Sequence, residues 1–298
     1  MARLTVLVGV LLISSCDAGG PIPPSDEIAA VWADMVERDD QPIIEARRFG
    51  TVTELSHIHL DGVMKRYIHA AGGDYSALAN DTEARELLSD YLEILAAARP
   101  ESMKNPQERL AFWLNAYNAL VLQSLVTLVD VDGPDAEVSK DEFAMFTQRR
   151  HRVAGFELTL EELNHLVLRG HSTYPDITHT PAEISRSLLD QHQLIFPAGG
   201  FDARINFAIS FGAQGFPPMP TQAYRAASLE QHLEERTQSF VNNDAYGVNS
   251  NGVSVLFHWF RRDFILSSGS VEGFINGYLR ESVNYGVDRP LRFDWRVR

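Results

Sequence analysis

The chain has 298 residues, of which 45% are hydrophobic and 22% are charged. This composition is typical of a globular protein with one or two domains and argues against an intrinsically disordered chain. The sequence contains 40 acidic and 26 basic side chains, which give a formal net charge of -14. Because binding to nucleic acid needs concentrated positive charge, we expect no nucleic-acid partner.

The N-terminus has the features of a secretory signal. A basic start at Arg3 and an apolar run over residues 4–13 precede Cys16, and the run is too short to span a membrane as a mature helix. The Ile-Ser-Ser-Cys sequence that ends at Cys16 also resembles the bacterial lipobox, in which the cysteine becomes the lipid-modified first residue of the mature protein. We therefore expect residues 1–16 to be a signal peptide and Cys16 to be the lipidation site. The alternative is a plain signal peptide with an incidental cysteine.

Residues 17–54 are predicted to form a tether and an N-terminal helix. The tether begins with a segment rich in glycine and proline, and apolar residues at helical spacing predict a helix over residues 27–37. Asp17 follows the expected lipid site and favours retention on the periplasmic side of the inner membrane. We expect an exported protein whose membrane contact is its lipid anchor. Cys16 is the only cysteine, so this protein has no internal disulfide.

The body of the chain contains several helix-start signals. Asn105 is followed by proline and, at the third position, by Glu108, which predicts a capped helix that runs to about Leu128. Three later sequences also place a glutamate three residues after a serine or threonine, and each predicts a helix start. These sequences begin at Ser139, Thr159 and Thr180.

Strands are predicted at four places. His151–Val153 and Phe156–Leu158 form one expected hairpin, and residues 244–248 and 253–257 form another around an Asn-Gly turn. Alternating apolar residues predict a buried strand over 205–211 and a closing strand over 291–297. Helices outnumber strands and do not alternate with them strictly. We therefore predict an α+β fold: a helix-rich single domain over residues 55–298 with a small antiparallel sheet built from hairpins.

Three motifs occur in the order found in a known family. Residues 112–120 read FWLNAYNAL, residues 201–220 read FDARINFAISFGAQGFPPMP, and residues 254–264 read SVLFHWFRRDF. They resemble motifs of the bacterial and plant family called domain of unknown function 547. The resemblance covers roughly residues 55–298 and implies the fold of that family. Its name leaves the activity unsettled.

The resemblance also implies that the reactive groups of this family are missing here. Its members usually carry a histidine, a lysine and two cysteines at the positions of Asn206, Gln214, Phe211 and Phe216. A thiolate beside an imidazole is a competent nucleophile, so relatives with these residues can support cysteine–histidine chemistry. We expect Phe211 and Phe216 to occupy apolar space in this chain.

His165 is the one candidate catalytic residue that matches a histidine of the family. It lies on the helix predicted over residues 160–169 and could act as a general base if a substrate came within hydrogen-bond reach. The alternative is a structural histidine. His57 and His59 form no convincing ligand set without a third group, so we expect no metal site, and no cofactor is indicated.

The candidate ligand-binding residues are amides, a hydroxyl and an arginine. Asn115 and Asn118 lie on an apolar helix, where they either orient a substrate or clamp the backbone of a neighbouring loop. Arg204 either holds a carboxylate or phosphate or pairs with an internal acid such as Asp263. The remaining candidates share the polar side of the strand predicted over 205–211. They are Asn206 and Ser210, and no G-x-S-x-G sequence surrounds the serine.

Two functional hypotheses remain. The first is an envelope-anchored hydrolase or transferase with His165 as the base, although it lacks an evident nucleophile. The second is a binding module that holds an unidentified small molecule or envelope protein without thiol catalysis. We prefer the second, because the two cysteine positions are occupied by phenylalanine. The aromatic residues of 259–264 either line a pocket or anchor the core.

Overall fold

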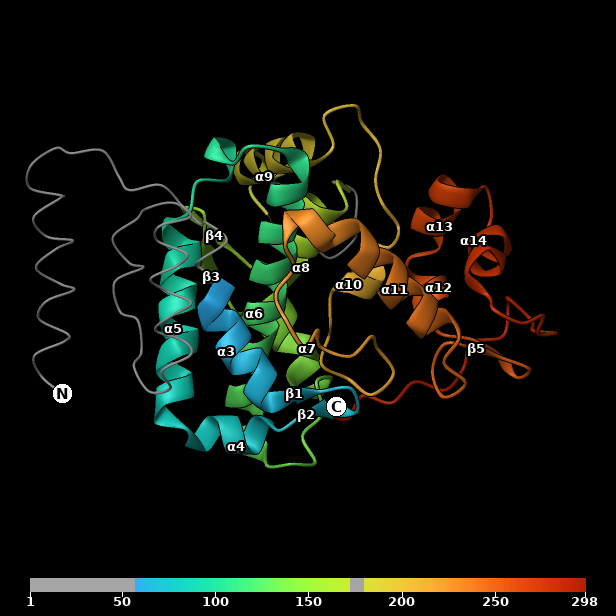
Figure 1. The fold of residues 1–298 in the computed structure, drawn as a ribbon, viewed down its shortest axis with the longest axis horizontal. Coiled ribbons are helices and arrows are strands. Elements are labelled where there is room, and N and C mark those ends of the chain that lie inside the picture. The colour runs from blue at the N-terminus through green and yellow to red at the C-terminus, as the bar shows by residue number, and fades with distance from the viewer. Residues whose placement is uncertain (1–56, 172–179) are drawn as a thin grey trace, which may run out of the picture. The chain divides into compact units, whose positions relative to one another are not determined.

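The computed structural model describes residues 57–171 and 180–298 of the chain (Figure 1). The described residues lie within one compact unit, Ile43–Arg298. The predicted signal peptide, the predicted lipidation site and the helix predicted over residues 27–37 lie outside the described residues.

The longest described helix, α6 (Pro106–Asp132), is the core of the fold. Every residue from 110 to 122 is buried, so this part of the helix is enclosed on all sides. By length and composition, α6 is the one described helix that qualifies as a candidate membrane span. However, 83% of its most apolar window is buried inside the protein, as expected for a core helix.

Other helices enclose α6 (Figure 1). α5 (Thr82–Ala97) and α4 (Tyr75–Asn80) contact α6, and α3 (His57–Tyr67) packs against α5. The remaining helices before residue 200 contact α6 directly or through a neighbour. They are η3 (Pro100–Ser102), α7 (Lys140–Thr147), α8 (Leu160–Glu162), the π-helix η4 (Leu163–Leu168) and α9 (Ala182–Ile195).

A second group of short helices follows residue 204. It consists of α10 (Ile205–Ala208), η6 (Ala226–Ser228), α11 (Leu229–Val241), α12 (Leu256–Trp259), α13 (Arg261–Ser268) and α14 (Val271–Tyr278). Phe207 of α10 is buried within this group, with its ring centroid 5.2 to 5.9 Å from four other phenylalanine rings. These rings belong to Phe240, Phe257, Phe264 and Phe274. The cluster fixes α10 against α11, α13 and α14.

The predicted helix starts are confirmed to different degrees. Asn105 Oδ1 accepts a hydrogen bond from the Glu108 amide at 2.9 Å, as the sequence predicts. The reciprocal capping box is present at Thr159, whose side chain accepts from the Glu162 amide at 3.1 Å while Glu162 Oε2 accepts from the Thr159 amide at 2.8 Å. α7 follows Ser139 without a side-chain cap.

The helix start predicted at Thr180 is displaced by one residue. α9 begins at Ala182 with Pro181 as its N-cap. The Thr180 hydroxyl instead donates a hydrogen bond to Glu162 Oε1 at 2.6 Å. This tertiary partner competes with the local cap, so the capping signal marks the helix but not its first residue.

The strands in the described part of the chain form three separate two-stranded antiparallel sheets. β3 (His151–Val153) and β4 (Phe156–Leu158) pair as predicted, with Val153 opposite Phe156. The second predicted hairpin is present but shorter, β5 (Val248–Asn249) with β6 (Gly252–Val253), because α12 begins at Leu256. An additional pair, β1 (Ile68–His69) and β2 (Gly72–Gly73), was not predicted. The helix-rich α+β class is confirmed.

The strand predicted over residues 205–211 is wrong. Residues 205–208 form α10 instead, and the alternation is misleading because the apolar and polar positions are both buried. Asn206 is 0% exposed and Ser210 is 1% exposed. Asp202 Oδ1 also accepts a hydrogen bond from the Arg204 amide at 3.0 Å, which favours a turn at this point.

The C-terminal segment is extended, as predicted, but it forms isolated bridges rather than a strand of a regular sheet. On one side, the Val138 amide donates to Trp295 O at 3.0 Å. On the other side, the Gly215 amide donates to Asp294 O at 3.1 Å. A side chain at Gly215 would collide with the Phe293 ring, which lies 2.5 Å from the position of a Cβ atom. This glycine therefore permits the close approach of the C-terminal segment.

Asn115 and Asn118 tie α6 to the second group of helices. Asn115 Nδ2 donates to Tyr224 O at 2.8 Å, and its Oδ1 accepts from the Tyr224 amide at 2.7 Å. Asn118 Nδ2 donates to Ala208 O at 3.1 Å, and its Oδ1 accepts from the Ser210 amide at 3.0 Å. Both amides thus clamp the backbone of a neighbouring segment, the structural alternative raised by the sequence.

We predict that Asn115→Leu lowers the free energy of unfolding by about 2–4 kcal/mol, because two buried backbone groups of Tyr224 lose their partner. Urea denaturation followed by circular dichroism measures this change. Gln123→Leu, at a half-buried position of the same helix, is the control and should change stability by less than about 0.5 kcal/mol. Equal stabilities of the two variants would contradict the clamp.

Candidate functional site

A buried ion pair lies at the centre of the region that contains the predicted site residues. Arg169 Nε and Nη2 donate to the two carboxylate oxygens of Asp263, at 2.7 and 3.0 Å. The two side chains are 2% and 0% exposed. Asn206 Nδ2 also donates to Asp263 Oδ2 at 3.0 Å. The carboxylate is therefore held by a bidentate arginine and by the amide that stands at the position of the family histidine.

His165 is placed beside this pair by the π-helix η4 (Leu163–Leu168). Its Nδ1 accepts a hydrogen bond from Arg169 Nη1, four residues later. Burial, and then the positive charge of Arg169, lower the pKa of His165 to about 2. The imidazole is consequently neutral at physiological pH and weakly basic. The structure therefore brings His165 to the site but does not give it the pKa near 7 that suits a general base.

His171 forms the outer edge of the same cluster. Its Nε2 lies 3.6 Å from Asp263 Oδ1, and its side chain is 12% exposed. Burial, followed by the charge of Arg169, lowers the pKa of His171 to about 4, although Asp263 opposes this shift. Gly170 has a φ of +65°, and a Cβ atom there would lie 2.5 Å from the ring of His192. Glycine therefore lets the chain turn tightly between Arg169 and His171.

Arg204 makes a different set of ion pairs from the one predicted. It does not pair with Asp263. Its Nη2 lies 2.7 Å from Asp202 Oδ2, and its Nη1 lies 2.6 Å from Glu230 Oε1 and 3.4 Å from Glu234 Oε2. Hydrogen bonds to Asp202 raise the pKa of Arg204 further. Asp202 is only two residues from Arg204 in the sequence, which favours this ion pair over one with an acid that is distant in the sequence.

Arg204 nevertheless lines a surface pocket of about 500 Å³. The other lining residues are Phe196, Gly199, Gly200, Phe201, Asp202, Ser267 and Tyr278. The Phe201 ring centroid lies 6.2 Å from that of His171. The pocket therefore adjoins the outer edge of the buried cluster. We call it the Arg204 pocket.

The remaining predicted ligand-binding side chains lie inside the protein rather than at this pocket. Asn115, Asn118, Asn206 and Ser210 are at most 1% exposed. The Ser210 hydroxyl accepts a hydrogen bond from the Gly212 amide at 3.1 Å. The structure thus brings Asn206 to Asp263 and His165 to Arg169. It places Arg204 at the neighbouring pocket and uses the two amides of α6 as clamps.

Phe211 and Phe216 occupy apolar space, as expected. Their rings stack with centroids 4.1 Å apart, and Phe216 is 1% exposed. The Phe211 ring also packs against Tyr117 at 5.9 Å, while the Phe216 ring packs against Trp259 at 5.6 Å. The aromatic residues of the motif at 254–264 therefore pack against the positions of the family cysteines.

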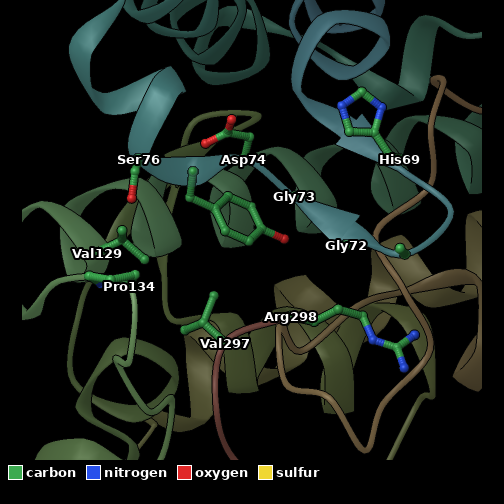
Figure 2. A pocket seen from close by; sticks show the side chains of 11 residues that line it. His69, Gly72, Gly73, Asp74, Ser76, Val129, Pro134, Val297 and Arg298 are labelled. Carbon is green, nitrogen blue, oxygen red and sulfur yellow. The ribbon is translucent and has the colours of Figure 1, made fainter.

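A second pocket, of about 410 Å³, lies away from the predicted residues, beside the β1–β2 hairpin (Figure 2). Asp74 and Ser76 line one side of it, and Arg298 lines another. Asp74 Oδ1 accepts from the Ala77 amide at 2.9 Å. Arg298 extends away from Asp74, donates to Gln214 O at 2.9 Å and lies 4.3 Å above the Tyr246 ring centroid. The charged groups of this pocket thus already have structural roles.

No group of three or more histidine, cysteine, aspartate or glutamate residues is arranged to hold a metal in the part of the chain that the structure describes. His57 and His59 both belong to α3, and His57 Nδ1 lies 2.9 Å from the Tyr91 hydroxyl. Sequence reasoning missed Arg169. Its spacing of four residues from His165 on one helix is the signal that points to it.

We predict that the single substitutions Arg169→Met and Asp263→Leu each lower the free energy of unfolding by about 3–5 kcal/mol, because each leaves a buried charge unpaired. The double variant should lose less than the sum of the two. Urea denaturation of all four proteins measures the coupling. Arg66→Met, which removes the exposed Arg66–Asp81 pair, is the control and should have little effect. Additive losses at the buried site would contradict the pairing.

The lowered pKa of His165 also predicts acid sensitivity. Its folded-state pKa of about 2 lies below the ordinary value of 6.5, so the unfolded state binds the proton more readily. The stabilisation is complete above pH 6.5 and is lost as the pH falls toward 2. In this window His165 should lower the free energy of unfolding by up to about 1.4 kcal/mol for each pH unit that the pH falls. His165→Gln should flatten the pH dependence of unfolding between pH 6.5 and 4; parallel profiles would contradict the assignment.

Comparison with known proteins gives one family match. No curated protein and no solved structure matches the chain. Residues 100–241 match the family described as protein of unknown function, DUF547. The matched segment includes α6, η4 and α10 and therefore carries His165, Arg169 and Asn206, whereas Asp263 lies beyond it. Residues 100–241 are therefore similar to the DUF547 family.

Proposed function

We propose that this chain is an exported lipoprotein whose DUF547 domain binds a small molecule or an envelope partner without thiol catalysis. The observation that carries the proposal is the stack of Phe211 on Phe216, with ring centroids 4.1 Å apart. These two side chains fill the positions at which relatives usually carry cysteine. The single cysteine of the chain, Cys16, is the expected lipidation site.

The surroundings of the stack also favour binding over catalysis. Ser210 is buried, and its hydroxyl accepts a hydrogen bond from the Gly212 amide, so it is poorly placed to attack a substrate. Asn206 takes the place of the family histidine and cannot accept a proton in the physiological pH range. The Arg204 pocket, at about 500 Å³, falls within the usual range of small-molecule sites.

The alternative is a hydrolase or transferase that uses His165 as its base. One observation favours it. Asn206 Oδ1 is buried and has no hydrogen-bond partner among the described residues. A buried polar atom without a partner calls for an explanation, and a catalytic role is one of the known explanations. Against it stands the pKa of about 2 for His165, which makes proton abstraction at neutral pH weak.

A thermal-shift screen of small molecules, with the full chain in a non-ionic detergent, tests the proposal. We expect at least one compound that raises the Tm of the parent, has a smaller effect on Phe201→Leu and is recovered unchanged by mass spectrometry. Turnover that resists iodoacetamide and is lost in His165→Gln would favour the alternative. Turnover that iodoacetamide abolishes would contradict a mechanism without a thiol.

Lipid anchoring is tested separately by labelling cells with a fatty acid. We expect the parent chain to take up label and to fractionate with membranes, because Cys16 would become the modified first residue. Cys16→Ser should take up no label. A parent without label, or a Cys16→Ser variant that labels equally well, would contradict the proposed anchor and leave the binding proposal to the screen above.

A further inference from the structure

The Arg204 pocket has walls that are mainly aromatic. Phe196 follows the end of α9, Phe201 lies in the loop before α10, and Tyr278 is the last residue of α14. All three side chains are half-buried, so each presents part of a ring to the pocket. Gly199 and Gly200, with φ values of +75° and +103°, form the turn between the two phenylalanines. Three separate segments thus bring aromatic rings to one hollow.

The charged side chains that line the pocket are Asp202 and Arg204, and two further acids lie beside Arg204. The Arg204 guanidinium is bonded to Asp202 and Glu230, and Glu234 lies 3.4 Å away. Three carboxylates therefore surround one guanidinium. The donors of Arg204 are already engaged with these acids, so a carboxylate or phosphate ligand would have to compete with them. This geometry disfavours the anionic ligand that the sequence suggested for Arg204.

The pKa of Tyr278, which lines the pocket, is also shifted by nearby negative charge. Burial, and then the negative charge of Glu234, raise the pKa of its phenol. Asp202 acts in the same direction, and Arg204 opposes both. A positive charge in the pocket would meet favourable electrostatics.

We propose that the Arg204 pocket binds a small organic cation with a quaternary ammonium or alkylammonium group. This inference rests on the proposed binding function and specifies the chemistry of its ligand. An aromatic face attracts a cation through the negative charge of its π-electrons, and the attraction is strongest where water is partly excluded. Phe196, Phe201 and Tyr278 line the pocket with aromatic rings. The three acids around Arg204 outnumber the one guanidinium, so the charge at this edge of the pocket is negative on balance. The pocket volume of about 500 Å³ accommodates a choline-sized group.

The test compares two ligands of the same shape and different charge. Choline is titrated against the full chain in a non-ionic detergent, and its N-methyl proton signal is followed by NMR. The neutral isostere 3,3-dimethyl-1-butanol is titrated in the same way. We expect choline to bind at least about fivefold more tightly than the isostere, because only a cation is attracted electrostatically to the aromatic rings and the carboxylates. Added salt should weaken choline binding.

Matched variants locate the binding. Phe201→Leu and Tyr278→Leu should each weaken choline binding by about fivefold, since each removes a ring and keeps an apolar side chain. Phe156→Leu, which makes the same change at a half-buried position outside the pocket, should bind choline like the parent. Choline binding that is unaffected by either pocket variant would overturn the proposal, because the cation would then bind elsewhere.

A further titration distinguishes a free organic cation from the headgroup of a lipid. Choline that binds more tightly than glycerophosphocholine indicates a free cation, whereas the reverse order indicates a lipid headgroup; both support recognition of a cation. If the isostere binds as tightly as choline and depends on Phe201, the cation inference fails and the proposed binding function stands. If no cationic, neutral or anionic compound shifts the Tm of the parent, both fail.

Discussion

The buried pair of Arg169 and Asp263 is the interaction on which the arrangement of the site depends. Removing two charges from water costs several kcal/mol per ion, and only well-placed partners offset this cost. The bidentate contact, the amide of Asn206 and the Phe260 ring, 4.5 Å below the guanidinium, supply those partners. The pair also joins η4 to α13, which the sequence separates widely. His165 is positioned as a consequence, because it lies against the same guanidinium.

Local signals in the sequence predicted much of the fold. The reciprocal cap of Thr159 and Glu162 and the β3–β4 hairpin depend on residues a few positions apart, and both are present. The same reasoning gave a wrong prediction, a strand, for residues 205–211. Alternation distinguishes a strand only when one face is exposed, and here both faces are buried in the core. At Thr180 a tertiary hydrogen bond to Glu162 replaces the expected local cap.

The candidate site was less predictable because its contacts are distant in sequence. Asp263 was foreseen as the partner of an arginine, but the arginine is Arg169, 94 residues earlier, rather than Arg204. No local sequence pattern predicts that Arg169 is the partner of Asp263. Arg204 pairs with Asp202 instead, because Asp202 is only two residues away. The motif resemblance drew attention to His165 and Asn206, which contact Arg169 and Asp263, respectively. It contained no information on the pKa of His165, which follows from burial and from the charge of Arg169.

The bridges of the C-terminal segment have a consequence for the order of folding. The backbone around Val138 and Gly215 pairs with residues 294–298, which are synthesised much later than either. Until then, Phe216 lacks the Phe293 ring, whose centroid lies 4.9 Å from its own, and the extended segments lack their partners. Long-range pairings of this kind form slowly, after loop closure. A chain built in this way completes its domain only after its last residues are available.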